Sequence, residues 1–488
     1  MRLSGVRVRA LLVALVGVAA VLRFGTLGRK GLWGDEISTV WLVQGSYPDL
    51  LHSVARLEST PPLYYSIAWV WAKLFGSGTL AVRSLPALLG VATVPITYLA
   101  AREFVSRRAS VMAAGLIAVN PLLVWYSQEA RSYALLVFLS ALGLWCFARA
   151  ARDSRTVMLA AWALVSSAAL TTHYFAVFLV VPQAVVLVRR SRGRRAVWPA
   201  LAFVCLAGAA LLPLALHQRS FGHADWISHN SLIGRLAALP GVFAAGFDAP
   251  SRAYIVAGAL LALAAAYIAA TRGAERDRRG GAQLAGLGLA ALALPVVLAL
   301  LGADYFSARN SLAALVPLVI GLSVGLSAPR LRSARLATVA VFALSLTIVV
   351  ATAAQPKFHS EDWRGAVEDL PHSTLARAIV ATPGQAGRKS LKYYLGATGV
   401  GASLRPRVRE VDVVALPEQG SSRVDSSVVA SLHRLKLRGF HRATLHRESD
   451  FVLVTFRARA PIAVSASDME RRVGGRGAMV VHQAARRG

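Results

Sequence analysis

Runs of about twenty apolar residues recur along most of this chain, and that is the length an α-helix needs to cross a bilayer core. Leu, Ala and Val fill these runs; the 488 residues are 56% hydrophobic and only 16% charged. The first run, Val8 to Leu22, follows Arg2, Arg7 and Arg9 as a signal peptide would. It has no small-residue cleavage site and further runs follow, so we expect a retained helix. The pattern predicts a polytopic α-helical membrane protein.

The arginines responsible for the formal charge of +30 lie largely in short loops between the apolar runs. This distribution is typical of cytoplasmic loops and argues against a nucleic-acid partner, which would require a continuous basic surface. Cys146 and Cys205 both lie inside apolar runs, so we expect neither a disulfide nor a metal pair. The basic clusters predicted to be cytoplasmic, together with the N-terminus, are 102–108, 149–155, 189–195, 272–279 and 330–335.

Connections of another kind, rich in Trp, Tyr, His and a few acids, alternate with the basic loops and are predicted to face outward. The crossings expected between the two sets number eleven: roughly 8–24, 82–101, 110–126, 132–149, 157–172, 174–189, 196–216, 251–270, 282–301, 311–327 and 335–353. A twelfth apolar segment, 61–75, would reverse every later basic loop if it crossed. We therefore expect a helix in the outer leaflet, begun by Pro61 and Pro62.

The pattern changes near residue 354, where helical apolar runs give way to alternating segments such as 377–383, 408–416 and 451–459. These predict strands, with a helix near Trp363 to Leu370. We predict three regions: a transmembrane domain over 1–353, a small extracytoplasmic α/β domain over 354–460 and a disordered tail over 461–488. The tail is rich in Arg, Gly and Ala.

Almost all unusual polar residues stand in the outward connections. Asp35 and Glu36 lie in the first of these, the outer loop 25–80. Charged groups cost roughly 2.5–3.5 kcal/mol each at the centre of a membrane helix, so several near one face suggest an outward-opening polar cavity. Each of these polar residues also has a simpler interpretation: an acid in a solvated loop, an arginine that snorkels to the interface, or a member of an aromatic belt. The other residues of this set are Tyr64, Glu129, Arg131, His173, Tyr174, Asp304, Tyr305 and Arg309.

A carboxylate and arginines at an outer membrane surface suit one kind of chemistry. The carboxylate can act as general base on an acceptor hydroxyl. The arginines can bind a phosphate whose negative charge grows as it leaves. The sequence has no glycine-rich phosphate loop that would indicate a cytosolic nucleotide. These groups together predict transfer from a lipid-linked phosphate donor.

Several motifs resemble, in their order, those of the GT-C glycosyltransferases, which include the dolichyl-phosphate-mannose protein mannosyltransferases and the lipid A aminoarabinose transferases. The similarity extends over about residues 8–370. Any single motif is weak, and the ordered set is strong. The motifs are "GDE" (34–36), "TPPLYY" (60–65), "RSLPALLGVATVPITYLAAREF" (83–104), "NPLLVWYSQEARSYAL" (120–135), "THYFAVFLVVPQ" (172–183), "FSARNSLAALVP" (306–317) and "EDWRGAVEDL" (361–370).

This resemblance implies an inverting transfer with a polyprenyl phosphate as leaving group. Asp35 would be the catalytic base, and Glu36 would shape the acceptor or sugar site. Arg131 and, more weakly, Arg309 would bind the donor phosphate. The remaining residues of the set, Glu129, His173, Tyr174, Tyr64 and Tyr305, would line the cavity.

The chain also departs from the family it resembles. The aminoarabinose transferases carry a phosphate-contacting lysine before the double proline, where this sequence has Thr60. The loop 217–250 is too short for the β-trefoil domain of the eukaryotic mannosyltransferases, so a protein acceptor is not implied. We expect no cofactor and no metal, although His217, His223, Asp225 and His229 offer ligands without any standard spacing.

The leading hypothesis is a glycosyltransferase of the bacterial plasma membrane and cell envelope. Its donor would be a polyprenyl-phosphate sugar such as mannose, and its acceptor a lipid, a glycan or a protein. The alternatives are a transporter or lipid flippase, which would favour mid-membrane charges and inverted repeats, and a non-catalytic scaffold. The sugar, the acceptor and the oligomeric state stay open.

Overall fold

The structure is a computed structural model, and its described part divides into two compact units. One unit comprises Met1–Leu27 and Leu42–Ala351, and the other comprises Gly28–Trp41 and Thr352–Gly488. The residues that the structure describes are 5–153, 156–190, 195–222, 225–247, 249–328, 331–354, 362–371, 377–382, 384–396, 398–399, 405–417, 424–448, 451–472 and 478–482.

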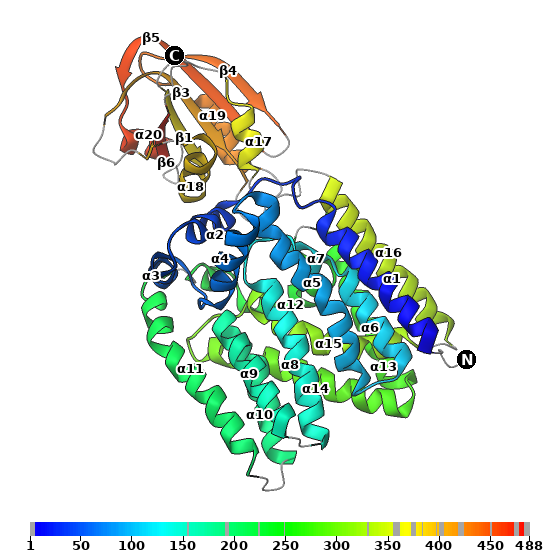
Figure 1. The fold of residues 1–488 in the computed structure, drawn as a ribbon. Helices are drawn as coiled ribbons and strands as arrows, with labels where there is room; N and C mark the ends of the chain where they lie inside the picture. The colour runs from blue at the N-terminus through cyan, green and yellow to red at the C-terminus, as the bar shows by residue number, and fades with distance from the viewer. Residues whose placement is uncertain are drawn as a thin grey trace. The chain divides into compact units, whose positions relative to one another are not determined.

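The first unit is helical (Figure 1). Helix α2 (Gly34–Gln44) begins in the second unit and ends in this one. The other helices of the first unit are α1 (Gly5–Phe24), α3 (Tyr47–Leu57), α4 (Leu63–Phe75), α5 (Thr79–Arg102), α6 (Arg107–Val119), α7 (Pro121–Tyr126), α8 (Tyr133–Asp153), α9 (Thr156–Thr172), η1 (Tyr174–Ala176), α10 (Val177–Arg190), α11 (Val197–Arg219), η2 (Asp225–His229), α12 (Leu232–Ala245), α13 (Arg252–Arg272), α14 (Glu275–Leu300), η3 (Arg309–Ala314), α15 (Leu315–Leu326) and α16 (Arg332–Ala354).

Burial separates these helices into inner and outer ones. α8 and α15 are mostly buried, and α8 packs against α5 and α9 while α15 packs against α13 and α14. α11 and α16 instead expose leucines and valines along their length, including Leu206, Leu212 and Leu216 on α11. Such continuous exposed apolar faces are unfavourable in water and suit contact with lipid tails. The chain is therefore a polytopic α-helical membrane protein, as predicted.

Among the described residues, eight helices are long and apolar enough to cross a bilayer. The three further crossings expected from sequence correspond to shorter helices: α6, α9 and α10 have 13, 17 and 14 residues. The expected run 110–126 is broken because Asn120 caps α7, its side chain accepting from the Leu123 N–H at 3.0 Å. Pro121 follows it and has no N–H to continue α6. The number of crossings stays a prediction.

The segment 61–75 forms α4, which has 13 residues. At 1.5 Å per residue this helix rises about 20 Å, less than the hydrocarbon thickness of about 30 Å. Its length therefore fits the expected position in one leaflet better than a full crossing.

The second unit contains a six-stranded sheet of order β2-β6-β1-β3-β5-β4. β1 pairs with β3 in parallel, and the pairs β1–β6, β3–β5 and β4–β5 are antiparallel. Its elements are α17 (Trp363–Glu368), β1 (Arg377–Thr382), α18 (Gly384–Leu395), β2 (Thr398–Gly399), β3 (Arg407–Ala415), α19 (Ser426–Arg434), β4 (His441–Arg447), β5 (Val452–Ala463), α20 (Ala466–Arg472) and β6 (Ala478–His482).

The central strand β1 is buried on both faces. Ala378 and Val380 point into a core with α19 and α20, and Ile379 and Ala381 into a second core with Trp363 of α17 and residues of α18. This alternation follows from the two-residue period of a strand. The predicted small C-terminal α/β region is therefore present.

The stretch expected to be a disordered tail differs from that expectation in its described part. β5 continues to Ala463, α20 follows, and β6 pairs with β1. The composition of the tail is polar, but the short run Ala478 to Val481 supplies apolar residues for both cores; Met479 and Val480 are fully buried. Residues 473–477 and 483–488 lie outside the described part of the chain.

Candidate active site

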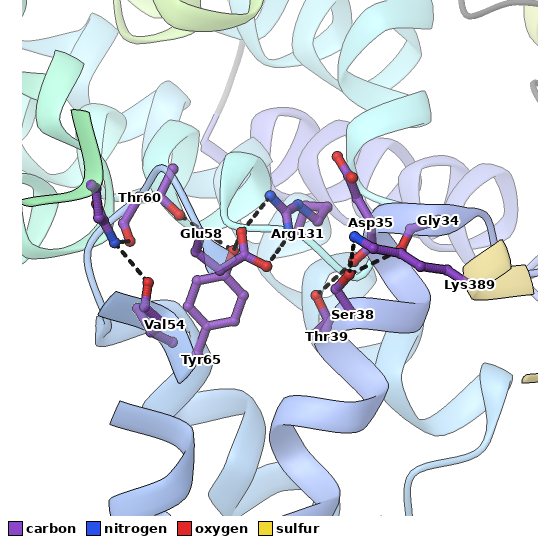
Figure 2. Close-up of polar contacts among 11 residues, drawn as sticks. Gly34, Asp35, Ser38, Thr39, Val54, Glu58, Thr60, Tyr65, Arg131 and Lys389 are labelled. Carbon is purple, nitrogen blue, oxygen red and sulfur yellow. Dashed lines mark hydrogen bonds and ion pairs between the residues drawn. The ribbon is translucent and has the colours of Figure 1, made fainter. Parts of the chain in front are cut away.

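Arg131 lies in the turn between α7 and α8 and makes a buried ion pair with Glu58, the C-terminal cap of α3. Its Nη1 and Nη2 donate to Glu58 Oε1 and Oε2 at 3.0 and 2.9 Å. Both side chains are less than one-tenth exposed. Two parallel N–H···O bonds fix the plane of the guanidinium as well as its position. Figure 2 shows this pair.

Tyr65, from the predicted "TPPLYY" motif, completes the coordination of Glu58. Its hydroxyl donates to Glu58 Oε2 at 2.7 Å, and the Thr60 hydroxyl lies 3.3 Å from it. The Arg131 guanidinium lies 5.8 Å from the centre of the Tyr65 ring, within cation–π range. Burial raises the pKa of Tyr65 well above its usual range, so at neutral pH the phenol is a hydrogen-bond donor.

His173 brings the two predicted phosphate-binding arginines into one electrostatic environment. It caps η1 between α9 and α10, its Nδ1 accepting from the Phe175 N–H at 3.4 Å, and it is almost fully buried. Burial and, to a smaller extent, the charges of Arg131 and then Arg309 together lower the pKa of His173 to about 3. His173 is therefore neutral at physiological pH. The structure thus gathers three of the predicted residues in the first unit.

Two aromatic rings lie close to His173. The ring centroid of Tyr133 is 5.9 Å from that of His173, and the centroid of Phe175 is 5.4 Å from it. The ring of Tyr305 follows Phe175 at 5.6 Å. Tyr133 begins α8, Phe175 lies in η1 between α9 and α10, and Tyr305 precedes η3; η1 contacts α9, α10 and η3, and η3 contacts α8. The predicted wall residue Tyr305 is therefore part of this aromatic row.

Gln218, at the end of α11, makes hydrogen bonds both to Tyr174, which was predicted to line the cavity, and to the backbone of α3 and the loop that follows it. The Tyr174 hydroxyl donates to Gln218 Oε1 at 2.8 Å. The amide nitrogen of Gln218 donates to the carbonyls of Val54 and Thr60 at 2.9 and 3.2 Å. The residues on either side of Glu58 are thus held in place by α11.

The structure also places three further polar residues of the predicted set. Glu129 Oε1 accepts from the Trp125 indole at 2.6 Å. Tyr64 is fully buried, with its ring edge-on to Tyr65 at 5.5 Å. Asp304 accepts from Arg235 of α12, whose hydrogen bond holds the pKa of Asp304 below its usual value. Asp304 therefore fixes the loop ahead of η3.

Asp35 and Glu36 lie in the second unit, in the first turn of α2. Carboxylates are favourable at this position because the helix dipole is positive at its N-terminus. The Thr39 hydroxyl donates to the Asp35 carbonyl at 3.3 Å, and the Ser38 hydroxyl to the Gly34 carbonyl at 3.1 Å. Lys389 of α18 donates to the Ser38 hydroxyl at 3.0 Å (Figure 2). The structure thus assembles one group around Arg131 and one around Asp35, and a joint role for them stays a prediction.

Sequence reasoning missed Glu58 and Gln218. Glu58 stands immediately before the "STPPLYY" stretch (59–65), and an acid between apolar helices next to a double proline was an available signal. Gln218 ends a long apolar helix and carries no comparable signal.

Among described residues, the ligand atoms of Asp369, His446 and Glu448 lie within 4.8 Å of one another, and all three side chains are exposed. They belong to the second unit and not to the loop 217–250. His223 of that loop lies outside the described residues. The expected absence of a metal stays a prediction.

The chain is similar to several solved structures at low sequence identity. The oligosaccharyltransferase of Archaeoglobus fulgidus, in complex with Zn and sulfate, is 15% identical with a TM-score of 0.45, covering 79% of this chain and 57% of its own. The Pmt1-Pmt2 protein O-mannosyltransferase complex of S. cerevisiae, bound to the sugar donor, is 19% identical with a TM-score of 0.35, covering 44% and 34%. This chain therefore spans about a third to three-fifths of the length of these proteins.

A third similar structure matches over nearly the full length of both chains. ArnT from Cupriavidus metallidurans, bound to undecaprenyl phosphate, is 15% identical with a TM-score of 0.41, covering 91% of this chain and 97% of its own. A search of the curated proteins found no match.

One family model also matches the sequence, from residue 59 to residue 217. This segment begins directly after Glu58 and contains Tyr65, Arg131 and His173. The family is described as dolichyl-phosphate-mannose-protein mannosyltransferase. Over residues 59–217 the chain is similar to that family, which confirms for this segment the family resemblance drawn from the sequence motifs.

Proposed function

We propose that this protein is a membrane glycosyltransferase that moves a sugar from a polyprenyl-phosphate donor to an acceptor hydroxyl at the outer face of a bacterial plasma membrane. The observation that supports this most is the buried Arg131, which lies inside the segment that matches the mannosyltransferase family and is paired with Glu58. Together with Arg309, Arg131 also lowers the pKa of His173. The N-terminus would be cytoplasmic and the C-terminal domain extracytoplasmic.

In this proposal Arg131 and Arg309 bind the donor phosphate. A guanidinium has five N–H donors, and the two that Glu58 accepts from Arg131 hold this cation in a fixed orientation. Burial strengthens such charge-assisted bonds, because water does not compete for them. Neutral His173 adds no positive charge, and because its Nδ1 accepts from the Phe175 N–H, its Nε2–H can donate one hydrogen bond. The arginines stabilise the charge that develops on the leaving phosphate.

Asp35 acts as the general base. Its carboxylate takes the proton of the acceptor hydroxyl as that oxygen attacks the anomeric carbon from the face opposite the phosphate. The bond between the anomeric carbon and the phosphate oxygen breaks, and the polyprenyl phosphate leaves with the electron pair. Attack from the opposite face inverts the anomeric configuration. Glu36, one residue away on α2, helps shape the acceptor or sugar site.

The test uses the full chain purified in detergent, radiolabelled polyprenyl-phosphate-mannose and a membrane extract as acceptor. We expect transfer in the wild type and its loss in Asp35→Asn, because the amide cannot take a proton. Glu275→Gln, an exposed acid at the start of α14, is the control and should retain full activity. Transfer at the wild-type rate in Asp35→Asn would remove Asp35 from the mechanism.

Donor binding is tested separately by equilibrium binding of labelled polyprenyl phosphate. Arg131→Ala should weaken binding by about 2–5 kcal/mol, the cost of truncating one partner of a buried charge pair. Arg272→Ala, at the exposed end of α13, should leave affinity unchanged. Wild-type affinity in Arg131→Ala would contradict the phosphate role.

A further inference from the structure

Helix α18 of the C-terminal domain holds the segment that carries Asp35 and Glu36. The Tyr394 hydroxyl accepts from the Leu32 N–H at 2.6 Å and donates to the Leu32 carbonyl at 3.0 Å. One side chain thus satisfies both backbone groups of a fully buried residue three positions before Asp35. The segment Gly28–Trp41 accordingly forms one compact unit with the C-terminal domain.

Two lysines on α18 continue this contact along α2. Lys389 Nζ donates to the Ser38 hydroxyl at 3.0 Å, and Lys392 Nζ lies 5.4 Å from the centre of the Trp41 ring. Positions three apart share a helix face, so both lysines point to α2. Ser38 is one helical turn beyond Asp35, and its own hydroxyl donates to the Gly34 carbonyl at 3.1 Å.

The approach of the segment to the domain is close enough to require glycine. A Cβ on Gly31 would lie 2.9 Å from Arg364 Cβ and 3.0 Å from the Tyr394 hydroxyl. Arg364, from α17, also donates to the Gly28 carbonyl at 3.3 Å. Contacts from two helices of the domain therefore fix the chain between Gly28 and Trp41.

We propose that the C-terminal domain is part of the catalytic apparatus, with α18 fixing the start of α2 and Lys389 as its principal positioning residue. This inference rests on the proposed function, because it concerns the base assigned there. Ordering a backbone costs conformational entropy, and the contacts from α18 offset this cost for the turn that carries Asp35 and Glu36. A displacement of about 1 Å at a catalytic group can lower a rate about 100-fold.

The activity test compares Lys389→Met with Lys436→Met, a matched change at an exposed lysine of the same domain. In Lys389→Met we expect kcat to fall about 10- to 100-fold, as misplacing a reacting group does, with the KM for donor within about twofold. Lys389→Arg keeps a donor and should recover most of the rate. Lys436→Met should match the wild type. An unchanged kcat in Lys389→Met overturns the inference.

Hydrogen exchange of the full chain tests the same contact without any assay of transfer. Amides of residues 32–40 should exchange faster in Lys389→Met and in Tyr394→Phe, while those of β1 and β3 keep their wild-type protection. Unchanged exchange at 32–40 overturns the inference. Absence of transfer in the wild type overturns the proposed function instead, and the exchange data separate the two failures.

A second, independent observation is an apolar groove of about 690 Å³ between α8, α10 and α14, within the first unit. Its walls include Phe147, Val181, Val185 and Leu287. It extends along α14 from Gln283 to Val297, a rise of about 21 Å. A Cβ built on Gly286, which lines the groove, meets nothing within 4 Å.

One end of this groove is basic. Arg152 and Arg190 lie there with Glu103, which is also paired with Arg149. Arg149 and Arg152 pair with Glu103, and Arg190 adds a further positive charge, so the end carries excess positive charge. We infer that the groove binds an anionic phospholipid of the bilayer, its phosphate at the arginines and one acyl chain along α14. Basic pockets between membrane helices bind such headgroups.

The test measures lipid retained by the purified full chain after equilibration with phosphatidylglycerol or phosphatidylcholine. We expect the wild type to retain phosphatidylglycerol preferentially and Gly286→Phe, which fills the groove, to retain at least tenfold less. Gly208→Phe is the matched control, since its Cβ on α11 also meets nothing within 4 Å. Equal retention of both lipids by the wild type, equal loss in both variants, or displacement of phosphatidylglycerol by polyprenyl phosphate would overturn the inference.

Discussion

At the scale of single residues, the carboxylate of Glu58 accounts for the position of Arg131. Its two oxygens accept three hydrogen bonds, two from Arg131 and one from Tyr65. A buried ion pair of this kind contributes little net stability, but removing one member leaves an uncompensated charge, which costs about 3–5 kcal/mol. The pair therefore orients the Arg131 guanidinium more than it stabilises the fold.

This leads to a prediction about coupling. Glu58→Ala and Arg131→Ala should each lower the free energy of unfolding by about 3–5 kcal/mol, and the double variant by much less than the sum. Unfolding of the purified protein by SDS in mixed micelles provides the measurement. The exposed pair Glu275 and Arg279 on α14 is the control, where the same cycle should show little coupling. Additive losses at Glu58 and Arg131 would show that the pair is not a unit.

The buried carboxyl of Asp412 on β3 makes the stability of the protein depend on pH. Burial raises the pKa of Asp412 to about 6, against the opposing effects of the Thr455 hydrogen bond and the Arg377 charge. The folded state therefore holds this proton more tightly than the unfolded state. Stability from this group is complete below the unfolded pKa of about 4 and falls by about 3 kcal/mol as the pH rises through 6.

Pulse proteolysis of the full chain in urea measures this effect. The urea concentration at the midpoint for cleavage within the sheet should decrease as the pH rises from 4 to 6. The decrease should be steeper in the wild type than in Asp412→Asn, whose side chain has no proton to lose. Parallel profiles for the two proteins would contradict the assignment.

At the scale of elements, helix packing depends on glycines at close crossings. A Cβ on Gly325 of α15 would lie 2.0 Å from the Ala265 carbonyl oxygen of α13, which is backbone and cannot rotate away. Gly325→Ala should therefore destabilise the protein by about 1–3 kcal/mol, the usual cost of overpacking. This loss outweighs the gain of up to about 1 kcal/mol from helix propensity.

Gly208→Ala is the matched control, because nothing lies within 4 Å of its Cβ on α11. It should keep or slightly raise stability in the same SDS titration. If both variants lose stability equally, the close crossing of α13 and α15 is not the cause.

The elements also show where sequence periodicity was sufficient. The strands expected at 377–383, 408–416 and 451–459 correspond to β1, β3 and β5, and the expected helix after Trp363 is α17. The alternation of apolar and polar residues and the length of apolar runs are properties of short segments, so they could be recognised without knowledge of the tertiary structure. β6 was missed because its few apolar residues lie in an Arg- and Gly-rich stretch, and pairing with β1 outweighs that composition.

At the scale of the whole molecule, the arrangement across the membrane is the property to test. Alternation of basic and aromatic loops predicts that loop 25–80 is outside and loop 189–195 inside. In a Cys205→Ser background, which removes the exposed native thiol, Gly45→Cys should react with an impermeant maleimide added to intact cells. Arg192→Cys should react only after the membrane is opened. Reaction of both positions from outside would require 61–75 to cross fully.

By itself the sequence determined the membrane class, the positions of most helices, the C-terminal α/β region and the candidates Arg131, His173 and Arg309. The length of an apolar run, the alternation of a strand and the placement of charges are properties of short segments of sequence. The same properties determine which segments cross a bilayer and in which direction. Only the tertiary structure decided which side chains meet. Glu58 reaches Arg131 across 73 residues, and Lys389 reaches Ser38 across 351. Such pairs depend on packing between distant elements, and a single sequence does not encode them as any local pattern.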